Sequence, residues 1–302
     1  MRVLAPSFHS PVFMSRWATF LLLFAFPFAT HTVQAQSLGY EGPTGVFVTP
    51  LASTAASPAY GAGRPVVAYH LLAGGPVIGT FSTVFVTEGF AKRLEAGYTR
   101  EIHALGDTTG LSPLWTEGFN IFHGEANILD ENHGKNPWVP ALSIGGIVRT
   151  TVRNVGGEIE AKNTTNGDIY LVATKIVTQT KKVPLVLNAG VRGTNSSLCG
   201  LGGNAPNLEA RAFGALGFVF TGPGKSTIIM ASEVAQQPQR IDVGGTPSFD
   251  IPTSVDYAAR IVPLPKHKLN IDFGVLQAAG RIAPGVDLQA RARFAFGVSY
   301  GF

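Results

Sequence analysis

The sequence predicts an all-β fold, a closed antiparallel transmembrane β-barrel of about twelve strands, within a range of about 10 to 14. Three observations predict this fold: a strictly alternating last strand, repeated segments of alternating hydrophobicity, and links between these segments that alternate in length. The barrel has to be closed because its strands lie in the hydrocarbon of the membrane. A strand in hydrocarbon must satisfy all its backbone polar groups, and only a closed barrel leaves no free edge.

The C-terminal strand alternates with period two, which is typical of a strand and not of a helix. Small residues on one face alternate with a large apolar face formed by Phe294, Phe296, Val298, Tyr300 and Phe302. An apolar face of this kind suits a strand that meets lipid. A terminal Phe with aromatic residues at preceding alternate positions resembles the C-terminal signal by which Gram-negative cells recognise outer-membrane barrels. We therefore expect a bacterial outer-membrane location and recognition by the barrel-assembly machinery.

Apolar and polar residues alternate in segments that match the length of a tilted transmembrane strand. The expected strands are residues 63–71, 78–89, 93–102, 118–128, 139–149, 167–178, 184–193, 208–220, 225–236, 253–262, 267–277 and 287–302.

The links between these segments fall into a short and a long set. The short links are residues 90–92, 179–182, 221–224 and 263–266, and the long ones are 103–117, 150–166, 194–207 and 237–252. Outer-membrane barrels have short periplasmic turns and longer extracellular loops. With twelve strands and periplasmic termini, each set falls on one side of the membrane. The links 72–77, 129–138 and 278–286 fit this rule less well.

Residues 1–35 have the features of a secretory signal peptide. The apolar run Trp17–Ala29 follows Arg16 and precedes Val33-Gln34-Ala35, a small-x-small cleavage pattern. The run is too short to span a bilayer of ~30 Å as a helix. A true start at Met14 would also give a compact signal peptide. The later apolar runs are interrupted every few residues, which excludes a helical membrane protein.

The composition argues against a soluble domain, for which the alternative is a β-sandwich or a lipocalin-like barrel, and against a nucleic-acid-binding protein. Charged residues make up 14% of the chain, well below the ~25% typical of soluble domains. Loss of the signal peptide removes Arg2 and Arg16 but no acidic residue, which lowers the formal net charge from +4 to +2. This near balance argues against nucleic acid as a partner. The single Cys199 cannot form an internal disulfide, so the fold does not depend on disulfides.

The alternation also assigns charged side chains to the lumen, since an unpaired charge facing lipid costs ~2 to 4 kcal/mol at the bilayer midplane. The expected lumen lining is Arg93, Glu95, Arg211, Asp256, Arg260, Asp272, Arg291 and Arg293. In a water-filled pore these charges would set up a transverse field that filters solutes. In a narrow barrel they would pair across the lumen and fill it.

Residues 36–62 form a segment of their own between the signal peptide and the barrel, residues 63–302. The stretch 39–52 within it is dense in Gly, Pro and apolar residues. This segment could thread into the lumen as a plug, lie along the periplasmic rim, or be a plain periplasmic linker.

Two stretches carry a resemblance to a known family. Residues 42–52 read GPTGVFVTPLA and, less sharply, residues 75–79 read GPVIG. In both the chain resembles an uncharacterised family of Gram-negative outer-membrane proteins that open with a similar stretch and continue as a barrel of this length. The resemblance covers most of the mature chain and implies location and fold. No activity is attached to that family that could be transferred.

The sequence gives little support to an enzyme. His123 and Glu125 share one face of a strand, but no Gly-x-Ser-x-Gly motif lies near any histidine. Neither metal-ligand spacing nor a dinucleotide fingerprint is present. We therefore expect no catalytic residues, no metal site and no cofactor, with an outer-membrane hydrolase as the least favoured alternative.

The function that we expect is passive passage of small polar solutes through a porin-like channel. The alternative is a non-conducting structural or export-accessory barrel whose lumen is filled and whose loops bind a partner or envelope polysaccharide. The expected partners are outer-membrane lipid, the assembly machinery, and either solutes or polysaccharide. A continuous water path through the lumen favours the channel, whereas a lumen blocked by paired charges or by residues 39–60 favours the alternative.

Overall fold

The computed structural model describes residues 37–104, 106, 117–151, 165–178, 183–200, 204–238, 251–263, 268–277, 279–283 and 286–302. The expected signal peptide, residues 1–35, and the start at Met14 lie outside these residues. Among the helices of the described residues, none is both long enough and apolar enough to cross a membrane.

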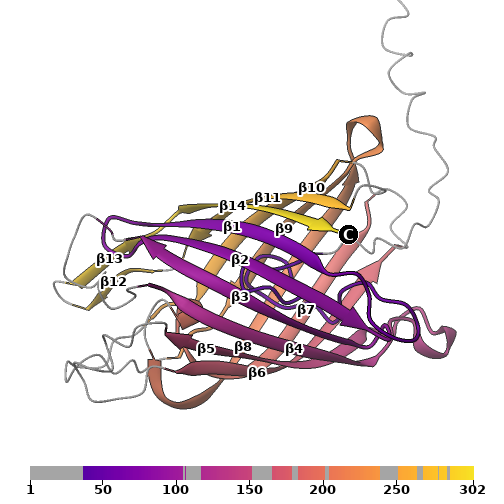
Figure 1. Cartoon of the computed structure of the whole chain (residues 1–302), viewed down its shortest axis with the longest axis horizontal. Coiled ribbons are helices and arrows are strands. Elements are labelled where there is room, and N and C mark those ends of the chain that lie inside the picture. Colours follow the sequence, from indigo (N-terminus) through magenta and orange to yellow (C-terminus); the bar gives the residue numbers. More distant parts are fainter. Residues whose placement is uncertain are drawn as a thin grey trace, which may run out of the picture. The chain divides into compact units, whose positions relative to one another are not determined.

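Twelve strands of the described chain close into one barrel, and every neighbouring pair is antiparallel (Figure 1). The order around the barrel follows the sequence, and β14 closes the ring against β1 and β11. The barrel strands are β1 Val66–Gly75, β2 Gly79–Phe90, β3 Leu94–Ala104, β4 Phe119–Leu129, β5 Ala141–Thr151, β6 Asn166–Val177, β7 Leu185–Ser196, β8 Asn204–Thr221, β9 Thr227–Ala235, β10 Ser254–Val262, β11 Leu269–Gln277 and β14 Arg293–Gly301. The expected fold class is confirmed.

Alternation along each strand separates an apolar outer face from a mixed inner face. On β6, Ile169 and Leu171 point outward and are 57% and 47% exposed, while Tyr170 and Val172 between them are 3% and 0% exposed. The exposed large hydrophobic side chains recur in the same way on strands all around the barrel. An outer face built from Val, Leu, Ile and Phe has the character of a surface that contacts hydrocarbon.

Most links obey the expected length rule. The short β2–β3, β8–β9 and β10–β11 links lie at the same end of the barrel as the start of β1 and the C-terminus. Two links depart from the rule. Residues 76–78 make a tight turn at the opposite end, and the link between β4 and β5 contains the 3-10 turn η2, His133–Lys135. Two further 3-10 turns are η3, Leu198–Gly200, and η4, Pro223–Lys225.

The expected last strand, residues 287–302, is wrong in its first part. Positive φ angles at Gln289 (50°) and Ala292 (50°) break the extended path, and the barrel strand begins only at Arg293. The preceding residues form a separate two-stranded hairpin of β12, Ala279–Ala283, and β13, Val286–Ala290. Figure 1 shows this hairpin at the end of the barrel opposite the C-terminus. From Phe294 onward the alternation holds: apolar residues are exposed or half-buried, and the small residues between them are buried.

Candidate functional site

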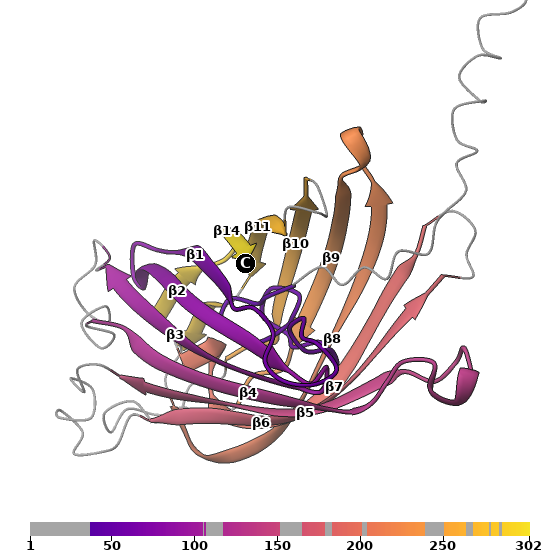
Figure 2. The same ribbon diagram turned by 45° about the vertical axis from the view of Figure 1, so that its right-hand side comes forward.

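The lumen contains residues 37–56, which precede β1 in the chain. Figures 1 and 2 show this part, drawn in indigo, coiled inside the barrel. We call residues 37–56 the inner segment, because residues 58–62 are exposed at the rim. It folds back on itself through backbone hydrogen bonds, for example from the Tyr40 N–H to the Phe47 carbonyl (2.7 Å), and both of these side chains are buried.

One loop of the inner segment is bound by a single carboxylate of β9. Glu233 accepts hydrogen bonds from three successive backbone N–H groups, those of Phe47 (2.8 Å), Val48 (3.1 Å) and Thr49 (2.7 Å), and from the Thr49 hydroxyl (2.6 Å). Charge-assisted hydrogen bonds of this type are about twice as strong as neutral ones. The carboxylate is fully buried, so these bonds are sheltered from water.

A second carboxylate and a guanidinium hold the segment on other strands. Glu95 of β3 accepts from the Thr44 N–H (2.8 Å), the Thr44 hydroxyl (2.6 Å) and the Ala55 N–H (2.7 Å). Arg260 of β10 donates to the carbonyls of Leu38 (2.9 Å) and Val46 (3.1 Å). Acidic wall residues therefore bind the donors of the segment, and a basic one binds its acceptors.

Neutral side chains of the wall also bind the inner segment. Polar groups of the wall that bond to backbone atoms of the inner segment are Thr83, Thr87, Thr99, Asn127, Thr174 and Asn188. Together with Glu95, Glu233 and Arg260, they come from seven of the twelve strands. A cavity between the segment and the wall, beside Ile147, has a volume of about 10 Å³, which is about the minimum for one water molecule.

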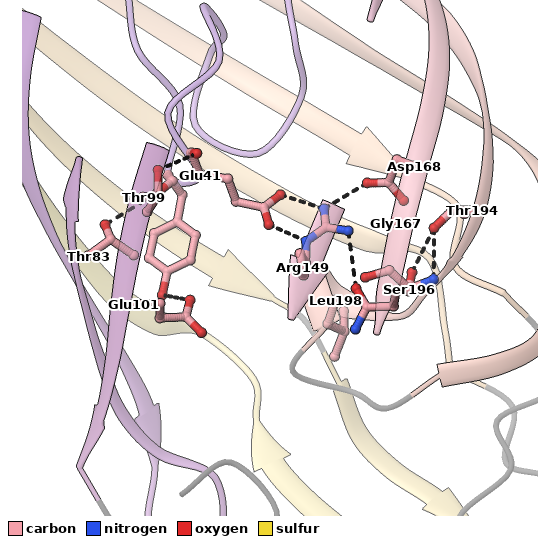
Figure 3. A network of polar contacts seen from close by, with 12 residues as sticks. Glu41, Thr83, Thr99, Glu101, Arg149, Gly167, Asp168, Thr194, Ser196 and Leu198 are labelled. Atoms are coloured by element: carbon pink, nitrogen blue, oxygen red, sulfur yellow. Dashed lines mark hydrogen bonds and ion pairs between the residues drawn. The ribbon is translucent and has the colours of Figure 1, made fainter. Parts of the chain in front are cut away.

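Glu41 of the inner segment is bound to Arg149 of β5 (Figure 3). The Arg149 Nε donates to one carboxylate oxygen and its Nη2 donates to the other (2.7 Å). The same guanidinium contacts Asp168 of β6 (2.7 Å) and Asn166 (3.3 Å). Arg149 is fully buried, so its charge is balanced by one carboxylate of the wall and one of the segment.

The expected lumen residues divide into two groups. Glu95, Asp256, Arg260 and Asp272 lie on the inner face and are at most 6% exposed. Arg260 and Asp272 are paired through a hydrogen bond of 2.5 Å between Nε and Oδ1. In the described conformation these charges contact the wall or the inner segment, so none of the four faces an open path.

The other four lie near the ends of the barrel. Arg93 precedes β3 and bonds to exposed Asp130 (2.6 Å), so it sits at the rim and not in the wall. Arg211 pairs with Glu209 and donates to the Gln237 carbonyl (2.8 Å). Arg291 lies in the bend before β14 and is exposed, and Arg293 donates to the Gln289 carbonyl (2.8 Å). The break between β13 and β14 explains why strand parity misplaced Arg291, whereas Arg293 is the first residue of β14 and keeps the inward parity of that strand.

Four glycines of the inner face each lie opposite a ring on the neighbouring strand. The register pairs are Gly97 with His123, Gly145 with Tyr170, Gly190 with Phe213, and Gly297 with His70. A Cβ atom built on any of these glycines would lie 2.2 to 2.3 Å from the ring opposite. The absent side chain therefore lets each ring lie flat along the wall, which leaves room for the inner segment.

We expect Gly297→Ala to destabilise the barrel, because its Cβ would lie 2.2 Å from the His70 ring, which packs between Phe47 (centroids 5.5 Å apart) and Phe85 (5.1 Å). Overpacking of this kind costs roughly 1–3 kcal/mol. The free energy of unfolding in urea, measured in lipid vesicles, checks this. Gly274→Ala is the matched control, since its Cβ would meet nothing nearer than 3.4 Å. Equal losses in the two variants would contradict the role of the glycines.

His123 and Cys199, which the sequence analysis considered, are both buried. His123 packs its Nε2 against the Thr87 hydroxyl (3.3 Å), beneath Gly42 of the inner segment. Burial, with the Glu41 carboxylate as the next cause, raises the pKa of the Cys199 thiol well above its ordinary value. Among the described residues, no group of three His, Cys, Asp or Glu side chains could hold a metal ion.

No protein-family model matches the sequence, and no curated protein is significantly similar to it. Solved structures do resemble the barrel. The KdgM porin aligns with a TM-score of 0.45 and 11% identity over 78% of this chain and 99% of that one. The NanC porin aligns with a TM-score of 0.47 and 9% identity over 79% of this chain and 100% of that one. An outer membrane channel from Pseudomonas putida F1 aligns with a TM-score of 0.45 and 11% identity over 81% of this chain and 96% of that one. At such values the function has to be inferred from the contacts of this chain itself.

Proposed function

We propose that the protein is an outer-membrane channel for small polar solutes that is closed in the described conformation by its inner segment. The observation that carries this proposal is the set of hydrogen bonds between charged wall residues and the backbone of residues 37–56, above all those of Glu233. When the segment leaves, the same wall residues would border a polar lumen.

The chemistry of the wall supports a lumen that opens. Burying a charged group costs several kcal/mol, and apolar residues of similar volume often fill such a space with no loss of stability. A barrel that stayed filled could therefore dispense with Glu95, Glu233 and Arg260. Those charges become useful, and are solvated again, once water enters the lumen.

The outer face supports location in a membrane that accepts β-barrels. Its exposed side chains are predominantly Val, Leu, Ile, Phe and Tyr, and the terminal Phe302 is 53% exposed at the end of the last strand. We propose that the bacterial outer membrane is this location, with lipid and the barrel-assembly machinery as partners. Export by a cleaved signal peptide, residues 1–35, is part of the same proposal, and no catalytic role is proposed.

The second candidate is a non-conducting structural or export-accessory barrel with a permanently seated segment. The filled lumen of the described conformation supports this alternative, because wall charges are paired with residues 38–55. Its loops would then bind a protein partner or envelope polysaccharide.

The two candidates differ in what Glu233→Gln should do. The substitution removes the carboxylate that accepts from Phe47, Val48 and Thr49. Loss of a hydrogen bond to a charged group is worth about 1.5–3 kcal/mol, so we expect the open fraction in planar bilayers to rise roughly 10- to 100-fold. Asp256→Asn is the matched control, because Asp256 lies directly opposite Glu233 and bonds to Gln277 rather than to the segment. Folded Glu233→Gln protein without channel events would favour the non-conducting barrel.

A further inference from the structure

The Glu41–Arg149 pair differs from the other contacts of the inner segment. Elsewhere wall side chains bind the segment backbone or a Thr or Tyr hydroxyl, but here a wall guanidinium binds a carboxylate. We propose that Arg149 is the recognition site for a solute carboxylate, and that Glu41 occupies this site as an internal substitute while the channel is closed. The inference rests on the proposed function, since it names the solute class and the competitor at the same lumen.

The geometry is specific for a carboxylate. Arg149 presents Nε and Nη2 to the two oxygens of Glu41, and Asn166 and Asp168 hold the guanidinium from the side of β6 (Figure 3). Two parallel N–H···O bonds match the spacing of carboxylate oxygens, and an ammonium group cannot reproduce that fork. The wall therefore provides a rigid, oriented donor pair and not only a positive charge.

The surrounding charge also favours an anion at this position. Arg192 of β7 is 7% exposed, and its charge and that of Arg149 both act on the same wall carboxylate, Asp168. Among the described residues, Arg192 Nε makes no hydrogen bond. Glu101 of β3, in contrast, is already bonded within the seated segment, since it accepts a hydrogen bond from the Tyr40 hydroxyl (2.7 Å).

These charges predict what happens when the segment leaves. Without Glu41, the described partners of the Arg149 guanidinium are Asp168 and Asn166, and the charge of Asp168 also acts on Arg192. Uncompensated buried charge is unfavourable, so the site attracts a replacement anion. A solute with a carboxylate on a short flexible stem supplies the same two oxygens as Glu41 and would compete with it.

Binding to the full-length protein tests the inference. The probes are N-acetyl-glutamate amide, which carries the side chain of Glu41, and its neutral counterpart N-acetyl-glutamine amide, both measured by isothermal titration calorimetry. In Glu41→Gln protein we expect the acidic probe to bind at least about tenfold more tightly than to the unsubstituted chain, and more tightly than the neutral probe. Glu117→Gln removes the same charge at an exposed turn and should leave binding unchanged.

Arg149→Lys in the Glu41→Gln background shows whether binding depends on the paired N–H donors of Arg149 or only on its positive charge. Lysine retains the positive charge but cannot bind both oxygens, so we expect the preference for the acidic probe to fall about tenfold. In gel electrophoresis a folded barrel changes its migration on heating, so a variant whose migration is the same before and after heating has not folded. An acidic-probe affinity that is unchanged in folded Arg149→Lys protein would overturn the proposal.

Channel recordings on the same variants keep the two proposals apart. Carboxylate binding that depends on Arg149, without any channel events, supports the site while it contradicts the channel function. Channel events with equal permeability and equal affinity for the two probes support the channel and overturn the carboxylate site. Binding and permeation that both favour the acidic probe support the two together.

Discussion

A protein that lacks residues 37–56 is expected to form a permanently open pore. The lumen would lose the side chains of Leu38, Tyr40 and Phe47, each at most 2% exposed in the intact chain, and water would replace the hydrogen bonds to Glu95 and Glu233. Planar-bilayer recordings should show steady channel events for the deletion and a closed state for the intact chain.

The control for the deletion is Tyr60→Ala. Tyr60 follows the inner segment but is 92% exposed at the rim, so its loss should leave the closed state intact. Barrels with and without residues 37–56 that give the same conductance would contradict closure by the segment. A folded deletion variant that shows no conductance would contradict the channel itself.

Phe302→Ser is expected to lower the amount of barrel assembled in the outer membrane severalfold. Phe302 is 53% exposed and packs edge-on against Tyr300, with ring centroids 5.4 Å apart, at the end of β14. The test is the fraction of protein in the outer membrane that resists unfolding by detergent until heated. The expected loss follows if the assembly machinery reads the terminal aromatic residue.

Phe294→Ser is the matched control for this prediction. Phe294 lies on the same outer face of the same strand, is 50% exposed, and differs in its distance from the C-terminus. It should reduce assembly less than Phe302→Ser does. Equal assembly of Phe302→Ser and the unsubstituted chain would contradict an assembly signal at the C-terminus.

The barrel could be predicted from the sequence because its outer face is dictated by local pattern. Alternation with period two marks each strand, and in residues 294–301 the pattern and the burial agree residue by residue. The prediction failed where the backbone leaves the extended region. The positive φ angles at Gln289 and Ala292 depend on the turn conformation, and neither Gln nor Ala is a residue type that indicates a positive φ. Parity counted across that break therefore misassigned Arg291.

The contacts between the inner segment and the wall were harder to predict, because they join residues far apart in the chain. Glu95 was assigned to the inner face by parity, but its partner Thr44 lies 51 residues earlier. Glu233 and Arg149 were missed, although both belong to segments with readable alternation, because no local pattern indicates a partner 184 or 108 residues away. The signal that could have found them is the same parity rule, applied to every charged residue within an expected strand.

Thiol labelling at Thr99 shows whether the inner segment keeps water away from the polar wall. Thr99 is fully buried on the inner face of β3 and donates to the Glu41 carbonyl (2.7 Å). The measurement uses Thr99→Cys in a Cys199→Ser background and a small charged thiol reagent added from the water. We predict protection in the intact chain and rapid labelling when residues 37–56 are deleted. Equal labelling of the two proteins, fast or slow, would mean that the inner segment does not shield the wall from water.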